Sequence, residues 1–134
     1  MITLDSTGII ALFRQRDQHH ASAVETLKSA NPPFVVPSGI LSEAVYMLER
    51  WSGFRELESF LLSIEEGEVL LDCGERDIPR VRQRAARYSD LPLGFADAAV
   101  IACAERRGGL VLTYDQRHFP VVAREGTIQI VGQG

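Results

Sequence analysis

The chain has 134 residues, of which 46% are hydrophobic and 24% charged, and its formal net charge is −4. These values are typical of one ordinary globular domain, and they exclude a collagen-like, low-complexity or intrinsically disordered chain. The acidic balance argues against a protein that binds nucleic acid through its overall charge, although it does not exclude a local RNA-binding surface.

The chain begins with a predicted strand and two predicted helices. The apolar start over residues 1–4 predicts a short strand that ends in a polar turn. Apolar residues over 9–13 predict a short helix after this turn, and their spacing over 21–27 predicts a second helix. The β-branched and aromatic run over 34–36 then predicts a buried second strand.

The middle of the chain is predicted to be mostly helical. Apolar residues at helical spacing predict one helix over residues 41–48 and another over 57–64, with a Ser-Gly break between them. A third strand is predicted over 69–71. Apolar residues spaced by three, four and three then predict a helix over 78–88 that faces the core.

The last third of the chain contains the strongest helical signal. An alanine-rich helix is predicted over residues 95–107, and a pair of glycines ends it. Strands are predicted over 110–113 and 128–131. Because strands alternate with helices or helix pairs throughout, the pattern predicts an α/β sandwich with a mainly parallel central sheet flanked by helices.

Four acidic residues lie at positions where an α/β fold of this kind binds its ligands. Asp5 follows the first strand and Asp115 follows the strand over 110–113, and ligands bind beyond the carboxyl ends of parallel strands. Glu43 and Asp97 lie near the starts of helices that are otherwise mostly apolar, where a carboxylate needs a partner. Taken alone, Glu43 or Asp97 is explained equally well as a helix-start carboxylate, and Asp5 as an ordinary turn aspartate. Together they predict a site for a divalent cation, which suits phosphodiester cleavage.

Four sequence motifs, in order, resemble the PIN-domain nucleases and, within them, the VapC-type toxins of bacterial toxin–antitoxin pairs. They lie at residues 2–7, 41–44, 91–98 and 112–119. Each motif is weak alone, but the four cover nearly the whole chain in the right order. The resemblance implies that residues 1–134 form a single PIN-like nuclease domain, a three-layer sandwich.

The resemblance also assigns candidate site residues. Asp5, Glu43, Asp97 and Asp115 match the acidic quartet of the family. It implies that Asp5 and Asp97 hold Mg²⁺ or Mn²⁺, and that Glu43 and Asp115 contribute directly or through water.

Several neighbouring polar residues are candidates for supporting roles. Thr113 matches a hydroxyl residue that supports the site by hydrogen bonding to a carboxylate, and Thr7, or as a second choice Ser6, is expected to do the same near Asp5. Asp90 is either a further member of the site or an ordinary residue at the end of the preceding helix. His118, three residues after the last acid, is a candidate for contact with the substrate.

The function that the resemblance implies is hydrolysis of RNA phosphodiester bonds by a Mg²⁺- or Mn²⁺-dependent endoribonuclease, the toxin of a VapBC-type pair. Its partners would be an RNA substrate, a cognate VapB-like antitoxin that blocks the site, and a second copy of the chain in a homodimer. None of these partners was inferred from composition or spacing.

Two other functions are compatible with an α/β pattern. A non-catalytic module that retains the PIN fold would bind RNA or protein without cleaving it. An aspartyl-phosphate phosphatase or receiver-like domain would use Asp5 as the phosphoryl acceptor. Such phosphatases usually carry a second aspartate two residues on, where this chain has Thr7, and a late lysine, whereas Lys28 is the only lysine. The intact quartet favours the nuclease.

Four arginines at helical spacing form a candidate RNA-binding stripe opposite the apolar one if residues 76–88 are helical. One interpretation is that they contact RNA phosphates. The other is that they form a solvated helix face with local ion pairs. The four are Arg76, Arg80, Arg84 and Arg87.

Three aromatic residues, Tyr46, Trp51 and Phe54, lie close together in the sequence around the end of one predicted helix. Packing in the core is the expected role. A groove for an antitoxin segment or a dimer contact is the alternative.

The two cysteines, Cys73 and Cys103, are far apart and form no C-x-x-C pair. We expect buried free thiols, which suit a reducing cytosol. No basic segment followed by an apolar one opens the chain, and no apolar run approaches the roughly 18 residues of a membrane span. We therefore expect a cytoplasmic protein that does not cross a membrane.

Overall fold

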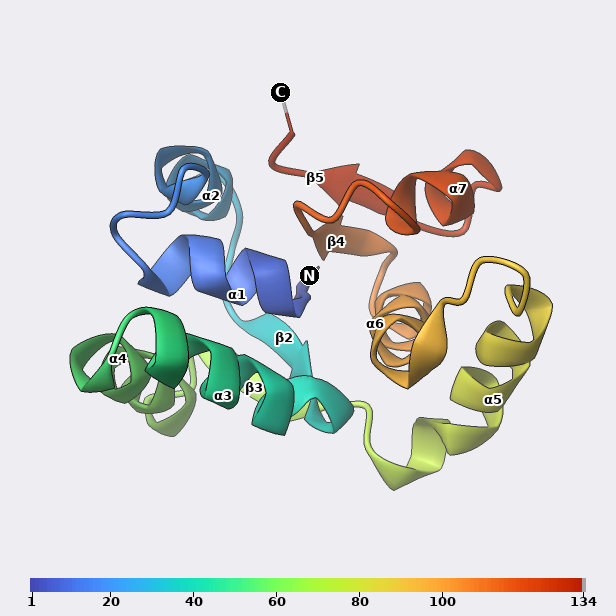
Figure 1. The fold of residues 1–134 in the computed structure, drawn as a ribbon, viewed down its shortest axis with the longest axis horizontal. Helices are drawn as coiled ribbons and strands as arrows, with labels where there is room; N and C mark the ends of the chain where they lie inside the picture. The colour runs from blue at the N-terminus through green and yellow to red at the C-terminus, as the bar shows by residue number, and fades with distance from the viewer. Residues whose placement is uncertain (134) are drawn as a thin grey trace.

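A computed structural model describes residues 1–133 and places the five predicted strands in one sheet (Figure 1). Every neighbouring pair is parallel, and the strand order β3-β2-β1-β4-β5 puts β1 at the centre. The strands are β1 (Ile2–Leu4), β2 (Phe34–Pro37), β3 (Val69–Asp72), β4 (Leu110–Leu112) and β5 (Gln129–Val131). The sequence-based prediction of a parallel central sheet is confirmed.

Helices cover the sheet on both sides, which gives the three-layer sandwich that the family resemblance implied. Figure 1 shows α1 to α4 gathered on one side, and α5, α6 and α7 on the other. The helices are α1 (Ser6–Phe13), α2 (His20–Lys28), α3 (Leu41–Trp51), α4 (Phe54–Glu65), α5 (Ile78–Arg87), α6 (Gly94–Arg106) and α7 (Phe119–Arg124). Six of them were predicted, and α7 was not, because its six residues are too short to show a helical periodicity.

Helix α6 contributes more buried residues than any other helix of the described chain. Every residue from Ala98 to Ala104 is buried, and the many alanines let the helix backbone pack close to β1, β2 and β4. A helix that is apolar all round belongs in the core rather than at the surface. The first turn of α6, which carries Asp97, is therefore held rigidly beside the central strands.

Helix α1 also approaches the sheet very closely. A Cβ atom added to Gly8 would collide with the carbonyl oxygen of Leu112 on β4, so only glycine fits there. This contact sets the first turn of α1 directly beside the end of β4. It thereby brings the two strand-end segments after β1 and β4 together.

The cysteines correct the expectation of two free thiols. Cys73 and Cys103 form a disulfide with a Cα–Cα distance of 5.5 Å, which is within the usual range. The bond joins the segment after β3 to α6, and both residues are buried beside Val35. The sequence concealed this pair because only the packing of α6 across the sheet brings residues 30 positions apart together.

The arginine stripe is largely occupied by tertiary ion pairs. Arg80 and Arg84 both pair with Glu105 of α6, whose side chain is only 5% exposed. Arg87 pairs with Glu125, just after α7. The ion-pair interpretation therefore describes these three arginines better than an RNA-binding stripe, although their partners lie outside α5 rather than along it.

The prediction that the aromatic cluster packs in the core is wrong. Tyr46, Trp51 and Phe54 are 61%, 52% and 69% exposed. They lie on α3 and at the start of α4, away from the buried side of each helix. As for membranes, no helix within residues 1–133 has both the length and the apolar character needed to span one.

Candidate active site

The four acids of the predicted quartet meet at one cavity of about 150 Å³. Asp5 follows β1 and Asp115 follows β4, so the two central strands deliver both residues to the same edge of the sheet. Glu43 lies in the first turn of α3 and Asp97 in the first turn of α6. The structure therefore brings together residues up to 110 positions apart, as the sequence predicted.

Asp5 is the most buried acid of the site, with an exposed fraction of 5%. It caps the N-terminus of α1, and its Oδ1 accepts hydrogen bonds from the Gly8 N–H (2.7 Å) and the Thr7 hydroxyl (2.8 Å). The Thr113 hydroxyl donates to Oδ2 at 2.6 Å. Both predicted threonines thus contact this carboxylate, and the hydroxyl of Thr7 also accepts from the N–H of Tyr114.

The environment of Asp5 disfavours its negative charge. Burial raises the pKa of this carboxyl to about 6, against the lowering effect of its three hydrogen bonds, and the nearby charge of Asp97 raises it further. All three donors are neutral groups. At neutral pH the buried carboxylate therefore carries a charge with no cationic partner among its contacts, which is the condition that a bound cation relieves.

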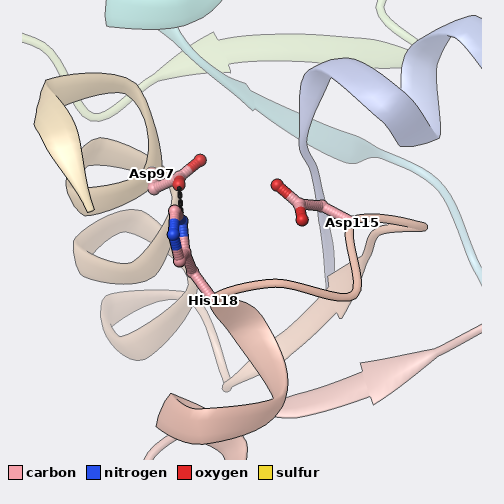
Figure 2. Close-up of side chains that lie close together, drawn as sticks. All are labelled: Asp97, Asp115 and His118. Carbon is pink, nitrogen blue, oxygen red and sulfur yellow. Dashed lines mark hydrogen bonds and ion pairs between the residues drawn. The ribbon is translucent and has the colours of Figure 1, made fainter. Parts of the chain in front are cut away.

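Asp97 is half-buried and bonded to a histidine. Its Oδ2 lies 2.9 Å from Nδ1 of His118, and the dashed line in Figure 2 marks this hydrogen bond. Burial raises the pKa of Asp97 and the charge of Asp115 adds to this, whereas the hydrogen bond from His118 lowers it. The charge of Asp115 thus disfavours ionisation of Asp97 across the cavity.

Asp115 is held by the loop that carries it. The Arg117 N–H donates to Oδ1 at 2.9 Å, and its guanidinium contacts both oxygens at 3.3 and 3.2 Å. Burial alone would raise the pKa of Asp115, but the hydrogen bonds and charge of Arg117 outweigh it and lower the pKa. The N–H of Asp115 also donates to the Thr113 hydroxyl, so one threonine links the two strand-end aspartates.

Glu43 is more exposed than the aspartates, and Ser6 holds it. The Ser6 hydroxyl donates to Oε2 of Glu43 at 2.7 Å. The sequence offers Ser6 as a second choice for supporting Asp5, whereas in the structure it supports Glu43. Asp90 is exposed and is not among the residues that line the cavity, which favours its interpretation as an ordinary residue at a helix end.

The sequence matches the profile of the PIN domain family over residues 2–125. The chain belongs to the PIN domain family. It is similar to Ribonuclease VapC26 of Mycobacterium tuberculosis (strain ATCC 25618 / H37Rv), with 29% identity over 118 residues that cover 87% of each chain. The family resemblance drawn from the four motifs is therefore confirmed.

Solved structures share the fold of this PIN domain. VapC20 of Mycobacterium tuberculosis, described as a sarcin-ricin loop cleaving toxin, superimposes with a TM-score of 0.79 at 19% identity, covering 91% of this chain and 95% of the other. DNA-bound VapBC from Salmonella typhimurium gives 0.63 at 24% identity, with 96% and 95% covered. FitAcB from Neisseria gonorrhoeae gives 0.62 at 16% identity, with 98% and 96% covered.

The donor set of this PIN domain fits a divalent cation. Asp97, Asp115 and His118 each offer one ligand atom, and these atoms all lie within 4.8 Å of one another. Figure 2 shows the Asp115 carboxylate pointing across the cavity toward Asp97. Carboxylate oxygens are the ligands that Mg²⁺ prefers, and Mn²⁺ also accepts an imidazole.

Sequence reasoning missed two roles beside the acids. Arg117 lines the cavity and pairs with Asp115, and the only local signal for it is an aspartate followed two residues later by a donor. The sequence makes His118 a candidate for contact with the substrate, and the structure shows that its ring bonds to Asp97. No spacing rule reveals this contact, because the two residues belong to separate elements, α6 and the start of α7.

Proposed function

We propose that this PIN domain is an endoribonuclease of the VapC type, the toxin of a toxin–antitoxin pair, which hydrolyses RNA phosphodiester bonds with Mg²⁺ or Mn²⁺. The observation that carries the proposal is the convergence of Asp5, Glu43, Asp97 and Asp115 on one cavity. The similarity to Ribonuclease VapC26 over most of both chains supports the choice of RNA as substrate.

In this proposal the four acids have different tasks. Asp5 and Asp97 hold the cation, and Glu43 and Asp115 contribute to it directly or through water. The unusual burial of Asp5 without a cationic contact supports its assignment, since a charge held there by neutral donors alone is unfavourable. When bound, the cation supplies positive charge that stabilises the phosphoryl transition state and activates water.

The hydroxyl residues keep the carboxylates in place. Thr7 and Thr113 bond to opposite oxygens of Asp5, and Ser6 bonds to Glu43, so each of these acids has a fixed orientation before substrate arrives. Preorganised ligands avoid a reorganisation cost during the reaction. Arg117 is 78% exposed at its side chain and lines the cavity, so its guanidinium is placed to contact an RNA phosphate.

The partners are also part of the proposal. The structural match to a VapBC complex supports a VapB-like antitoxin as the protein that blocks the site. The proposal further includes a homodimer and a cytoplasmic location, where the RNA substrate is present.

An aspartyl-phosphate mechanism is disfavoured by the surroundings of Asp5. Such phosphatases also carry a late lysine near the phosphoryl acceptor. Lys28 is the only lysine of the chain, and it is not among the residues that line the cavity. The position two residues on, where such phosphatases carry an acid, holds Thr7, which donates to Asp5 instead.

The test is RNA cleavage by the purified protein with Mg²⁺ or Mn²⁺ against structured and unstructured RNA. Asp5→Asn and Asp97→Asn should each reduce the rate roughly a hundredfold or more while circular dichroism stays unchanged, because each removes a proposed cation ligand. The matched control is Asp90→Asn, which alters an exposed aspartate outside the cavity and should cleave normally.

Two results would contradict the proposal in different ways. Cleavage that persists in both variants, or in excess chelator, would reject the carboxylate-bound cation. A folded protein that binds RNA but cuts none of the substrates with either cation would instead favour the non-catalytic PIN module.

A further inference from the structure

Each carboxylate of the cavity has its own hydrogen-bond donor, and the donor of Asp97 is a histidine. Asp5 is held by two threonines and a backbone N–H, Glu43 by Ser6, and Asp115 by Arg117. For Asp97, His118 is the one side-chain partner among residues 1–133. The proposed function assigns roles to the acids but leaves this imidazole without one.

His118 is set in place by the core rather than by the cavity. It directly precedes α7, whose first residue, Phe119, is fully buried together with Val122. The histidine side chain itself is only 16% exposed. Because the neighbouring phenylalanine fixes the backbone, the ring has little freedom to leave Asp97.

The hydrogen bond to Asp97 determines which ring nitrogen of His118 carries the hydrogen. Nδ1 of His118 lies 2.9 Å from Oδ2 of Asp97, and an ionised carboxylate only accepts hydrogen bonds. Nδ1 therefore carries the hydrogen and cannot at the same time offer a lone pair to a cation. Of the three residues that lie within ligand distance of one another, His118 therefore uses Nδ1 for Asp97, and only its Nε2 keeps a lone pair.

We infer that His118 is a positioning residue, which fixes Asp97 through the Nδ1–H···Oδ2 hydrogen bond so that the other oxygen of Asp97 faces the divalent cation. This inference rests on the proposed function, because it assumes that Asp97 binds a cation there. Partners that hold a metal-binding residue in orientation typically change metal affinity about 10- to 100-fold when they are removed.

The test exploits the different reach of two amide side chains. The amide nitrogen of asparagine stands near the position of Nδ1, whereas that of glutamine reaches further, toward the position of Nε2. Mn²⁺ affinity is measured by calorimetry on the full-length protein, without RNA, for His118→Ala, His118→Asn and His118→Gln. Thermal unfolding without metal is measured alongside, to separate affinity from folding.

We expect His118→Ala to weaken Mn²⁺ binding about 10- to 100-fold, His118→Asn to recover most of this loss, and His118→Gln to remain weak. The matched control is His20→Ala, because Nδ1 of His20 contacts the carbonyl oxygen of Ala11 at 2.8 Å, outside the cavity lining. That variant loses a similar hydrogen bond and should keep wild-type Mn²⁺ affinity.

Wild-type Mn²⁺ affinity in His118→Ala would overturn the inference. Tighter Mn²⁺ binding by His118→Gln than by His118→Asn would also overturn it, because that order would indicate that His118 is a direct ligand through Nε2. Asp97→Asn distinguishes a failure of the proposed cation site from a failure of the role of His118. If it keeps both Mn²⁺ affinity and RNA cleavage, Asp97 holds no cation, and that part of the proposed function fails. If it loses both while His118→Ala binds normally, only the role of His118 fails.

Discussion

Replacing Asp5 with asparagine should stabilise the metal-free protein at neutral pH, because the substitution removes a buried charge that only neutral donors surround. The pKa of Asp5 rises from 3.8 to about 6 on folding. At about 1.36 kcal/mol per unit, ionisation of Asp5 costs the folded state roughly 3 kcal/mol at neutral pH. A weaker hydrogen bond to Thr113 in the variant offsets about 1 kcal/mol of this gain.

The change with pH of the difference in stability does not depend on the weaker hydrogen bond to Thr113. A carboxyl whose pKa is raised in the folded state contributes stability that is present below pH 3.8 and is lost as the pH rises through about 6. Asparagine does not titrate. The advantage of Asp5→Asn in the free energy of unfolding should therefore grow by about 2 kcal/mol between about pH 4.5 and about pH 7.5.

The assay is urea unfolding of the wild type and Asp5→Asn at both pH values, with chelator present. Asp90→Asn serves as the control, since its exposed carboxyl should give a difference that changes by no more than about 0.5 kcal/mol. A stability difference for Asp5→Asn that is the same at both pH values, or larger at the acidic one, would refute the argument.

Adding Mn²⁺ should reverse the order of stability. A cation that binds only the folded state stabilises it in proportion to the logarithm of its concentration above the dissociation constant. The wild type should gain stability in this way at neutral pH, and Asp5→Asn should not. A variant that gained as much as the wild type would show that Asp5 is not a ligand.

Three further changes test other parts of the structure. Gly8→Ala should lower the free energy of unfolding by about 1–3 kcal/mol, because its Cβ collides with the Leu112 carbonyl oxygen; a thermal midpoint equal to the wild type would contradict the close approach of α1 to β4. Reducing the Cys73–Cys103 disulfide, which closes a loop of 30 residues, should cost roughly 3–4 kcal/mol in urea unfolding; stability that does not respond to reductant would argue that the bond is not formed in solution. Arg117→Gln should weaken RNA binding and reduce the salt dependence of the binding constant by about one phosphate contact. An unchanged salt dependence would show that the guanidinium of Arg117 stays with Asp115 instead.

The strand and helix pattern was readable from the sequence because each element carries its own periodicity. The β-branched runs around Val35 and Val111 predicted buried strands, and the alanine-rich stretch before Arg106 predicted a long helix. The positions of Asp5 and Asp115 at strand ends were equally local facts. Parallel topology then required the two residues to meet, because adjacent parallel strands end at the same edge of the sheet.

Contacts between elements were decided only by the tertiary structure. The disulfide, the pairing of the arginines with Glu105 and the exposure of Trp51 depend on which helix faces meet, and one helical periodicity fits several such arrangements. The same holds for His118, whose ring reaches Asp97 because the buried Phe119 fixes the start of α7. Sequence periodicity determined which residues turn toward the core, whereas the order and packing of the elements determined which partners they found there.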